Sequence, residues 1–140
     1  MDNAFKPVWV IFAVVLALVG FGLVRGKMGP KEAVGWTTDY GSAFEVAAKE
    51  KKPVLLYFTA SWCPPCQQMK KTTFADASVA EALRDCVAVK VDVDENRQAA
   101  AEHKVRSIPH MMLLSPDGKV IKKTGGYIPP EQFILWLKGS

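Results

Sequence analysis

Two cysteines separated by two prolines are the residues of this chain best suited to chemistry, in the run Trp62-Cys63-Pro64-Pro65-Cys66. Two thiols this close along a chain can form and break a disulfide, so the pair predicts reversible thiol–disulfide exchange. The reactive species in that exchange is the thiolate, which the surroundings of the sulfur have to stabilise. Redox chemistry is therefore the leading functional hypothesis.

The segments on either side of the pair predict how it is positioned. An apolar run typical of a buried strand, residues 53–59, precedes it, and helix-favouring residues 67–71 follow it. Since proline is well tolerated in the first turn of a helix, we expect a helix to begin near Pro64. Cys63 would then lie at the helix N-terminus, where the unpaired N–H groups and the helix dipole lower a thiol pKa below about 8.5.

Position along this helix predicts separate roles for the two thiols. Cys63 precedes the helix and is expected to be partly exposed, whereas Cys66 lies one turn in and is expected to be more buried. Cys63 is therefore the predicted nucleophile and Cys66 the thiol that resolves the mixed disulfide. Neither proline has a backbone N–H, which leaves the N–H of Cys66 as the nearest donor to the Cys63 sulfur. The direction of electron flow stays open.

A zinc site and a purely structural disulfide are the alternatives for the same pair. Structural zinc needs about four ligands, commonly from two short knuckles. The remaining candidates, Cys86, His103 and His110, are scattered without that spacing. A disulfide across two intervening residues closes too short a loop to stabilise a fold much. The sequence therefore predicts redox-active cysteines and no metal.

The first 31 residues differ in character from the rest of the chain. Val8–Val24 is a run of 17 residues without a charge, about 26 Å of helix and at the short end of what spans a bilayer. We expect a short N-terminal tail over residues 1–7, a transmembrane anchor over 8–25 and a polar tether over 26–35. A cleaved signal peptide is the alternative, although no small-residue cleavage pattern follows the run.

Two arguments about orientation oppose each other. Arg25, Lys27 and Lys31 follow the anchor, and the positive-inside rule taken alone would place the domain in the cytoplasm. A dithiol domain has most use where its substrates carry disulfides, outside the reducing cytosol. The expectation is therefore a single-pass membrane protein with an extracytoplasmic, periplasmic domain, and a cytoplasm-facing domain is the alternative.

The charge balance argues against a nucleic-acid partner. The net charge is +4, but four of the 18 Lys and Arg fall in residues 1–31, so the remainder of the chain is nearly neutral and carries no basic patch of the kind that binds nucleic acid. The cations beside the anchor suit anionic lipid headgroups instead.

Helices and strands are expected to alternate through a single domain over residues 36–140. Further helices and strands accompany the strand over 53–59 and the helix from Pro64. A turn at Ser115–Gly118 favours a hairpin. Such an order predicts an α/β fold with a mixed sheet flanked by helices. The further expected helices cover 41–51, 76–84 and 96–103, and a last one begins at Pro129-Pro130. In the first of these, Phe44, Ala47 and Ala48 are expected to face inward. The further expected strands cover 87–93, 110–115 and 119–124.

Five motifs together are typical of one protein family: Lys52-Pro53-Val54-Leu55-Leu56-Tyr57-Phe58, Trp62-Cys63-Pro64-Pro65-Cys66, Val89-Lys90-Val91-Asp92-Val93-Asp94, Ser107-Ile108-Pro109 and Gly125-Gly126-Tyr127. Through them, residues 36–139 resemble the thioredoxin superfamily, and within it the thioredoxin-like domains of bacterial membrane thiol:disulfide interchange proteins. The resemblance implies a thioredoxin-like fold with four or five strands, and no metal or organic cofactor.

The resemblance also implies a substrate-binding surface. Pro109 matches the cis-proline of the family, which faces the cysteine pair and leaves the backbone of Ile108 free to bind an extended substrate segment. A proline at the start of an ordinary strand is the alternative. Trp62 is expected to be partly exposed beside Cys63 as a contact for substrate, with packing on the helix as its alternative role.

One position departs from the family pattern. Thioredoxins place a buried aspartate six residues before the first cysteine, where it helps to move the proton of the resolving thiol, and this chain has Tyr57 there. A tyrosine with a pKa near 10 is a poor base at neutral pH, so we expect Tyr57 to pack and another group or water to handle the proton. Lys90 and Asp94 match a family lysine and acid near the site, or form an ordinary charge pair at a strand end.

Two further residues have open roles. Cys86 makes the number of cysteines odd, and at the entrance to an apolar strand it is expected to be a small buried core residue rather than a redox partner. His110 follows Pro109 and is either a group that tunes Cys63 or a structural strand histidine.

The leading hypothesis is a membrane-anchored thiol:disulfide oxidoreductase that acts on protein disulfides through Cys63 and Cys66. Its expected partners are protein substrates with disulfides or thiols, an upstream electron donor or acceptor, and the lipid bilayer. Two other functions remain: a module that uses the thiols to hand on copper or to service an apocytochrome, and a non-catalytic scaffold with the same fold.

Overall fold

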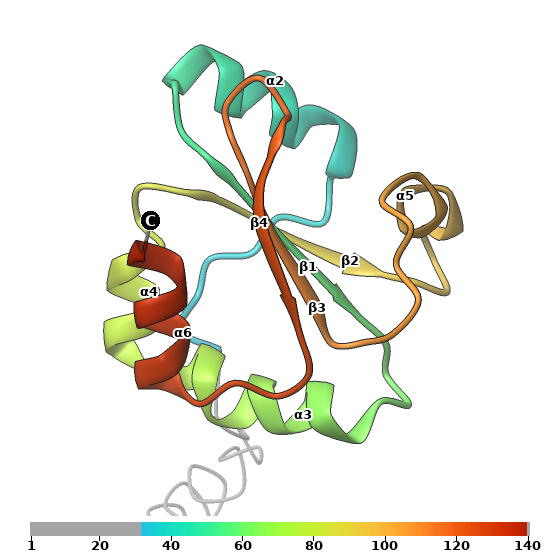
Figure 1. Cartoon of the computed structure of the whole chain (residues 1–140), viewed down its shortest axis with the longest axis vertical. Coiled ribbons are helices and arrows are strands. Elements are labelled where there is room, and N and C mark those ends of the chain that lie inside the picture. Colours follow the sequence, from blue (N-terminus) through green and yellow to red (C-terminus); the bar gives the residue numbers. More distant parts are fainter. Residues whose placement is uncertain (1–31, 140) are drawn as a thin grey trace, which may run out of the picture.

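The strand that leads to the cysteines lies inside a four-stranded sheet of order β2-β1-β3-β4 (Figure 1). A computed structural model describes residues 32–139 of the chain. β1 pairs in parallel with β2 and antiparallel with β3, and β3 pairs antiparallel with β4. The mixed sheet expected from the sequence is therefore confirmed. The strands are β1 (Val54–Thr59), β2 (Val87–Asp92), β3 (His110–Leu114) and β4 (Val120–Gly125).

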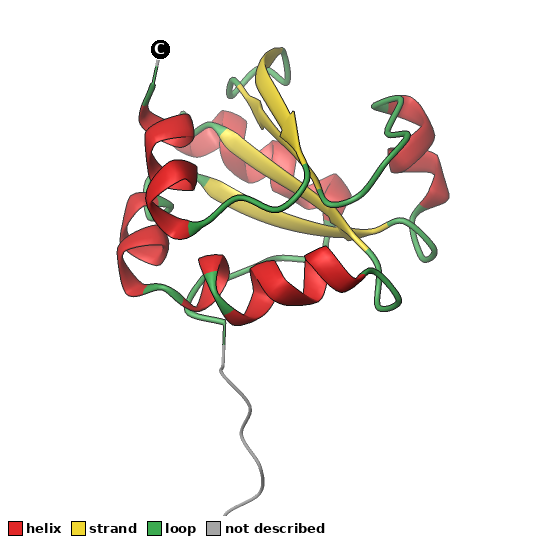
Figure 2. Ribbon diagram, turned by 60° about the horizontal axis from the view of Figure 1, so that its bottom comes forward, coloured by secondary structure: helices red, strands yellow, loops and turns green. Residues whose placement is uncertain are grey.

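Helices cover both faces of this sheet (Figure 2). Alternate residues of β1 point to opposite faces: Leu55 and Tyr57 enter one core cluster, and Leu56 and Phe58 the other. The first face is covered by α3 (Pro64–Lys71), η1 (Thr73–Ala75), α4 (Ala77–Ala82) and α6 (Pro130–Lys138), and the second by α2 (Tyr40–Glu50) and α5 (Arg97–Glu102).

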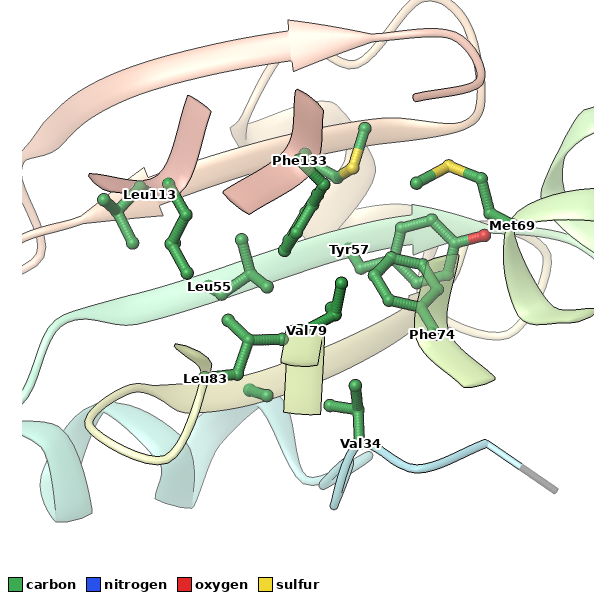
Figure 3. Packing of buried hydrophobic residues seen from close by; sticks show 12 residues of the cluster. Val34, Leu55, Tyr57, Met69, Phe74, Val79, Leu83, Leu113 and Phe133 are labelled. Atoms are coloured by element: carbon green, nitrogen blue, oxygen red, sulfur yellow. The ribbon is translucent and has the colours of Figure 1, made fainter. Parts of the chain in front are cut away.

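Aromatic rings anchor η1 to the sheet, and Met69 of α3 is buried in the same core cluster. The ring of Tyr57 lies 4.7 Å from that of Phe74, and Phe74 meets Phe133 of α6 edge to face at 5.6 Å. Figure 3 shows Tyr57 and Phe74 side by side, with the tyrosine oxygen directed towards the helix that carries Met69. The helix that follows the cysteines is thus held by contacts in the interior of the domain.

Oxygen atoms of side chains cap the N-termini of α2, α4 and α5. Asp39 accepts from the N–H of Ser42, Asp76 from that of Ser78, and Asn96 from that of Ala99. Each cap satisfies an N–H that has no partner inside its helix.

The inward face of α2 differs from the expectation by one position. Ala47 is fully buried as expected, but Ala48 is exposed and Ala43 is buried in its place. Since residues four apart lie on the same side of a helix, Ala43 and Ala47 face the sheet together. The prediction for Ala48 was wrong because an alanine-rich run does not by itself identify its inward side.

The segment before α2 runs along the outer edge of β2. The N–H of Thr37 donates to the carbonyl of Ala88, and the N–H of Lys90 donates to the carbonyl of Thr37, each across 2.9 Å. Val34 is 7% exposed and belongs to the core. Residues 32–35 of the expected tether therefore pack on the domain.

The expected tail (1–7), anchor (8–25) and most of the tether lie outside the described residues. Within residues 32–139, no helix combines the length and apolar character that crossing a membrane requires.

Candidate active site

Cys63 and Cys66 form a disulfide at the start of α3, with their Cα atoms 5.3 Å apart. α3 begins at Pro64, so Cys63 occupies the N-cap position. The N–H of Cys66 donates to the Cys63 sulfur across 3.3 Å, the donor expected because the two prolines have none. Cys63 Sγ therefore lies where the helix N-terminus stabilises negative charge once the disulfide is reduced.

The expected difference in exposure between the two cysteines is not observed. Both residues are 2% exposed, so the prediction that Cys63 is partly exposed was wrong. The reason is packing from distant segments, since Ala60 is buried with the pair and Ile108 and Val93 pack against all three. Position on the helix and the hydrogen bond from Cys66, rather than exposure, distinguish Cys63 in the disulfide state.

Trp62 is the exposed residue of the motif, with 64% of its surface accessible. Its indole Nε1 donates to Asp94 Oδ2 across 2.7 Å. Asp94 is itself placed by its own N–H, which donates to Asp92 Oδ1. The charge pair considered for Lys90 and Asp94 is therefore not the observed arrangement, because Asp94 binds the indole instead.

The Ile108–Pro109 peptide bond is cis, as the resemblance implied. Pro109 is buried, and its carbonyl accepts from the N–H of Gly126 across 2.9 Å. Ile108 packs against the cysteine pair, and among residues 32–139 no backbone hydrogen bond uses its N–H or its carbonyl. Ile108 and Pro109 thus lie on the same side of the domain as the disulfide and the exposed Trp62.

Tyr57 is a packing residue with one polar contact to the site. It is 1% exposed, and its hydroxyl donates to the carbonyl oxygen of Cys66 across 3.4 Å. Burial, opposed by a hydrogen bond with Thr59 and assisted by the Glu32 carboxylate, raises the pKa of Tyr57 to about 12. Such a hydroxyl stays protonated at neutral pH and is no base, in agreement with the expectation.

Glu32 is a residue beside the site that the sequence did not predict. Its Oε2 pairs with Lys90 Nζ, and the two side chains are 14% and 24% exposed. Glu32 Oε1 is buried and has no hydrogen-bond partner among the described residues. Both residues line a cavity of about 200 Å³ that Tyr57 and Cys66 also line. Glu32 lies 34 positions before Cys66 in a segment that looked like a tether, so no local pattern pointed to it.

The two histidines lie apart from the sulfurs. The ring of His110 packs 6.4 Å from that of Phe58, and His103 Nε2 lies 2.6 Å from the Tyr40 hydroxyl. Burial lowers the pKa of His110 below 6.5, and Lys123 lowers it further. Burial also lowers the pKa of His103, against an opposing effect of Glu102. Within residues 32–139 neither ring has a hydrogen bond to a cysteine.

Cys86 is a free, half-buried thiol that packs against the core cluster of Tyr57 and Phe74. Burial raises the pKa of Cys86, as does Asp85, while Lys52 lowers it. A raised pKa disfavours the reactive thiolate. Within the described part of the chain, no three His, Cys, Asp or Glu side chains gather where they could hold a metal ion.

Comparison with known proteins assigns the class that this fold and site define. Residues 40–139 match the family model of the thioredoxin-like domain. The chain is 39% identical over 90 residues to a thioredoxin of Alicyclobacillus acidocaldarius subsp. acidocaldarius, covering 64% of this chain and 82% of that protein. The solution structure of a thioredoxin from Thermus thermophilus superimposes with a TM-score of 0.68 at 27% identity, over 76% of this chain and 85% of that one.

A second kind of relative is similar over the same region. The chain is 31% identical over 104 residues to the thiol:disulfide interchange protein DsbD of Campylobacter jejuni strain RM1221. The match covers 69% of this chain but 18% of that protein, so it concerns one domain of a longer polypeptide. The chain belongs to the thioredoxin superfamily. It is a thiol:disulfide oxidoreductase whose redox centre is the Cys63–Cys66 pair.

Proposed function

We propose that this chain is a membrane-anchored oxidoreductase that exchanges electrons with protein disulfides or thiols through Cys63. The observation that carries the proposal is the Cys63 sulfur at the N-terminus of α3, in contact with the N–H of Cys66. In the reduced protein the Cys63 thiolate attacks a substrate disulfide and forms a mixed disulfide. Cys66 then attacks Cys63, restores the internal disulfide and releases the substrate as a dithiol.

The surface around the pair suits an extended polypeptide as substrate. Ile108 has a backbone N–H and carbonyl without backbone partners, and it lies against the cysteines. A substrate strand that bonds to these two groups would bring its disulfide over Cys63, as in other cases of strand addition. The exposed indole of Trp62, held by Asp94, offers an apolar contact next to the same place.

The compartment follows from the chemistry of the substrates. Protein disulfides are common outside the cytosol and rare within it. An anchor over residues 8–25 would keep the domain at the membrane, and we assign the domain to the extracytoplasmic, periplasmic side. The relative named a thiol:disulfide interchange protein, which is matched over one domain, supports thiol–disulfide exchange as the reaction. An upstream membrane protein would then donate or accept the electrons.

Covalent capture in cells tests the proposal. In a Cys66→Ser variant of the full-length chain the mixed disulfide at Cys63 has no resolving thiol, so substrates should accumulate as adducts that a reductant releases. The matched control replaces both Cys63 and Cys66 by serine and should capture nothing. Adducts with extracytoplasmic proteins support the proposal. Capture limited to an apocytochrome or a copper protein would favour the alternative functions, and equal capture by both variants would contradict it.

A further inference from the structure

The position that holds a buried aspartate in thioredoxins holds Tyr57 here, and a tyrosine with a pKa of about 12 accepts no proton at neutral pH. Cys66 nevertheless has to lose its proton before it can attack the mixed disulfide, since only a thiolate is a good nucleophile. The domain therefore requires a proton acceptor from another part of the chain, within reach of Cys66 directly or through water.

The cavity beside Cys66 contains a carboxylate that suits this task. Glu32 reaches it from the N-terminal segment, which is tied to the domain by the 2.7 Å bond from the N–H of Ala33 to the carbonyl of Phe74. Glu32 Oε2 is engaged by Lys90, whereas Oε1 is buried without a partner among the described residues. An unpartnered buried carboxylate oxygen is costly and is seldom retained without a role.

The other ionisable groups around the cavity are less suitable. Lys70 and Lys90 are cations, Tyr57 stays protonated, and Asp92 is the one rival acid. Asp92 Oδ1 already accepts the N–H of Asp94, which helps to place the acceptor of the Trp62 indole. Glu32 therefore remains as the acid that combines burial, an unused oxygen and a common cavity with Cys66.

We propose that Glu32 is the proton acceptor for Cys66, acting through the cavity that the two residues line and held in place by Lys90. At about 200 Å³ the polar cavity has room for water to connect the carboxylate and the thiol. Within the mixed disulfide the Cys66 proton passes to Glu32. The Cys66 thiolate forms the bond to Cys63 Sγ, the bond from Cys63 to the substrate breaks, and the substrate leaves with that electron pair. Glu32 then returns the proton to the departing thiolate or to solvent.

The proposal makes the N-terminal segment part of the catalytic machinery. A shortened chain that begins at residue 36 would retain both cysteines, Trp62 and Pro109 but lose the carboxylate. Such a truncation would also remove Val34 from the core and the bond from Ala33 to Phe74, so substitution of Glu32 alone is the cleaner test.

A two-step thiol assay separates the attack by Cys63 from the resolution by Cys66. The full-length chain with Cys86→Ser, reduced and purified in mild detergent, is mixed with less than one equivalent of the aromatic disulfide DTNB. The first thionitrobenzoate is released when Cys63 attacks, and the second when Cys66 displaces the other half from Cys63. Each release is followed by absorbance from about pH 6 to pH 9, the range in which thiols of ordinary pKa begin to ionise.

With Glu32→Gln we expect the rate of the first release to stay within about twofold of that of the parent. The rate of the second release should fall by about 100-fold at pH 7, which is the lower end of what a general base contributes. The slowing should shrink as the pH approaches the ordinary thiol pKa of about 8.5. Glutamine can still accept from Lys90, so it preserves the contact and removes the base. Glu32→Asp should retain more of the second rate than Glu32→Gln. Glu95→Gln changes an exposed acid that does not line the cavity, and it is the matched control with an unchanged second release.

Several results would overturn the assignment. A second release that Glu32→Gln leaves unchanged at every pH would remove Glu32 from the reaction, and one slowed by Asp92→Asn alone would assign the proton to Asp92. Equal slowing of both releases at all pH values would show a purely structural role. The role of Glu32 rests on the proposed function of Cys63 as the attacking thiol. A parent protein without the first release would therefore overturn the roles of both Cys63 and Glu32. A normal first release isolates the test of Glu32.

Discussion

The indole Nε1 of Trp62 donates to Asp94 Oδ2 across 2.7 Å and holds an exposed ring beside the disulfide. Asp94 follows β2, so this bond joins the loop of the cysteines to the end of the neighbouring strand. An exposed ring held in one orientation is a better contact surface than a free one, because less conformational entropy is lost when substrate binds.

We expect Asp94→Ala to weaken the reaction with protein disulfides severalfold without affecting the fold. Both partners are exposed, so the free energy of unfolding should change by less than about 0.5 kcal/mol. The reaction with a small aromatic disulfide, which needs no docking surface, should be unchanged. Glu95→Ala removes a neighbouring exposed acid that has no such bond and is the control. Equal protein-disulfide kinetics in the two variants would show that Trp62 orientation is unimportant.

The purified full-length chain should catalyse reduction of a model protein disulfide in the presence of dithiothreitol, and Cys63→Ala should return the rate to the uncatalysed background. Cys63 lies at the helix terminus, and no other described thiol has a comparable position. Cys86→Ser should keep most of the activity, since Cys86 packs against the core. Comparable turnover in the parent and in Cys63→Ala would contradict the assignment of the nucleophile.

The pKa of the reduced Cys63 thiol should lie well below 8.5. The motivating observation is the N-cap position of Cys63, with the N–H of Cys66 directed at its sulfur. Ultraviolet absorbance of the thiolate against pH would measure it in a Cys66→Ser, Cys86→Ser variant. A titration midpoint at or above about 8.5 would mean that the helix terminus does not stabilise the anion.

Stability should fall as the pH drops from about 7.5 to 5.5, in part through His110. Burial and Lys123 hold the pKa of folded His110 below its ordinary value of 6.5. At a pH between the folded and the unfolded value the unfolded chain binds more protons, and acid therefore favours unfolding. Urea midpoints against pH should show a weaker slope in His110→Gln, and also in Lys123→Gln, which removes the second cause. An unchanged slope in both variants would be evidence against this origin.

The full-length chain should stay with membranes after a carbonate wash, because Val8–Val24 carries no charge. The domain should face the non-cytoplasmic side. A membrane-impermeant maleimide applied to cells with a permeabilised outer envelope should then reach Cys63 once the pair is reduced. A Cys63→Ser, Cys66→Ser variant controls for labelling elsewhere. Labelling that requires a broken inner membrane would instead support the positive-inside rule and a cytoplasm-facing reductase.

The elements around the cysteines were predictable because their signals are local. The apolar run of β1, the prolines at the start of α3 and the turn at Ser115–Gly118 each depend on a few adjacent residues, and all three are observed. The N–H donor to Cys63 was predictable for the same reason, since the prolines exclude other nearby donors. Pro109 was identified only through the family resemblance.

What could not be predicted depends on contacts between distant parts of the chain. Cys63 is covered by Ile108, which lies 45 positions later, and Lys90 pairs with Glu32, which lies 58 positions earlier. No periodicity or spacing encodes such a meeting. Glu32 looked like part of a polar tether because residues 26–35 mix charged residues with glycines and a proline, as solvated linkers do.

The cover that Ile108 places over the cysteine pair comes from a later part of the chain, which has a consequence for how the protein is made. The nascent chain presents Cys63 and Cys66 well before it presents Ile108 and Pro109, and Cys86 emerges within that interval. All three thiols are then available together before the segment that covers the active pair has been synthesised. In an oxidising compartment, chains that pair with Cys86 during this interval must be reshuffled by a thiol partner, and Cys86→Ser removes that requirement.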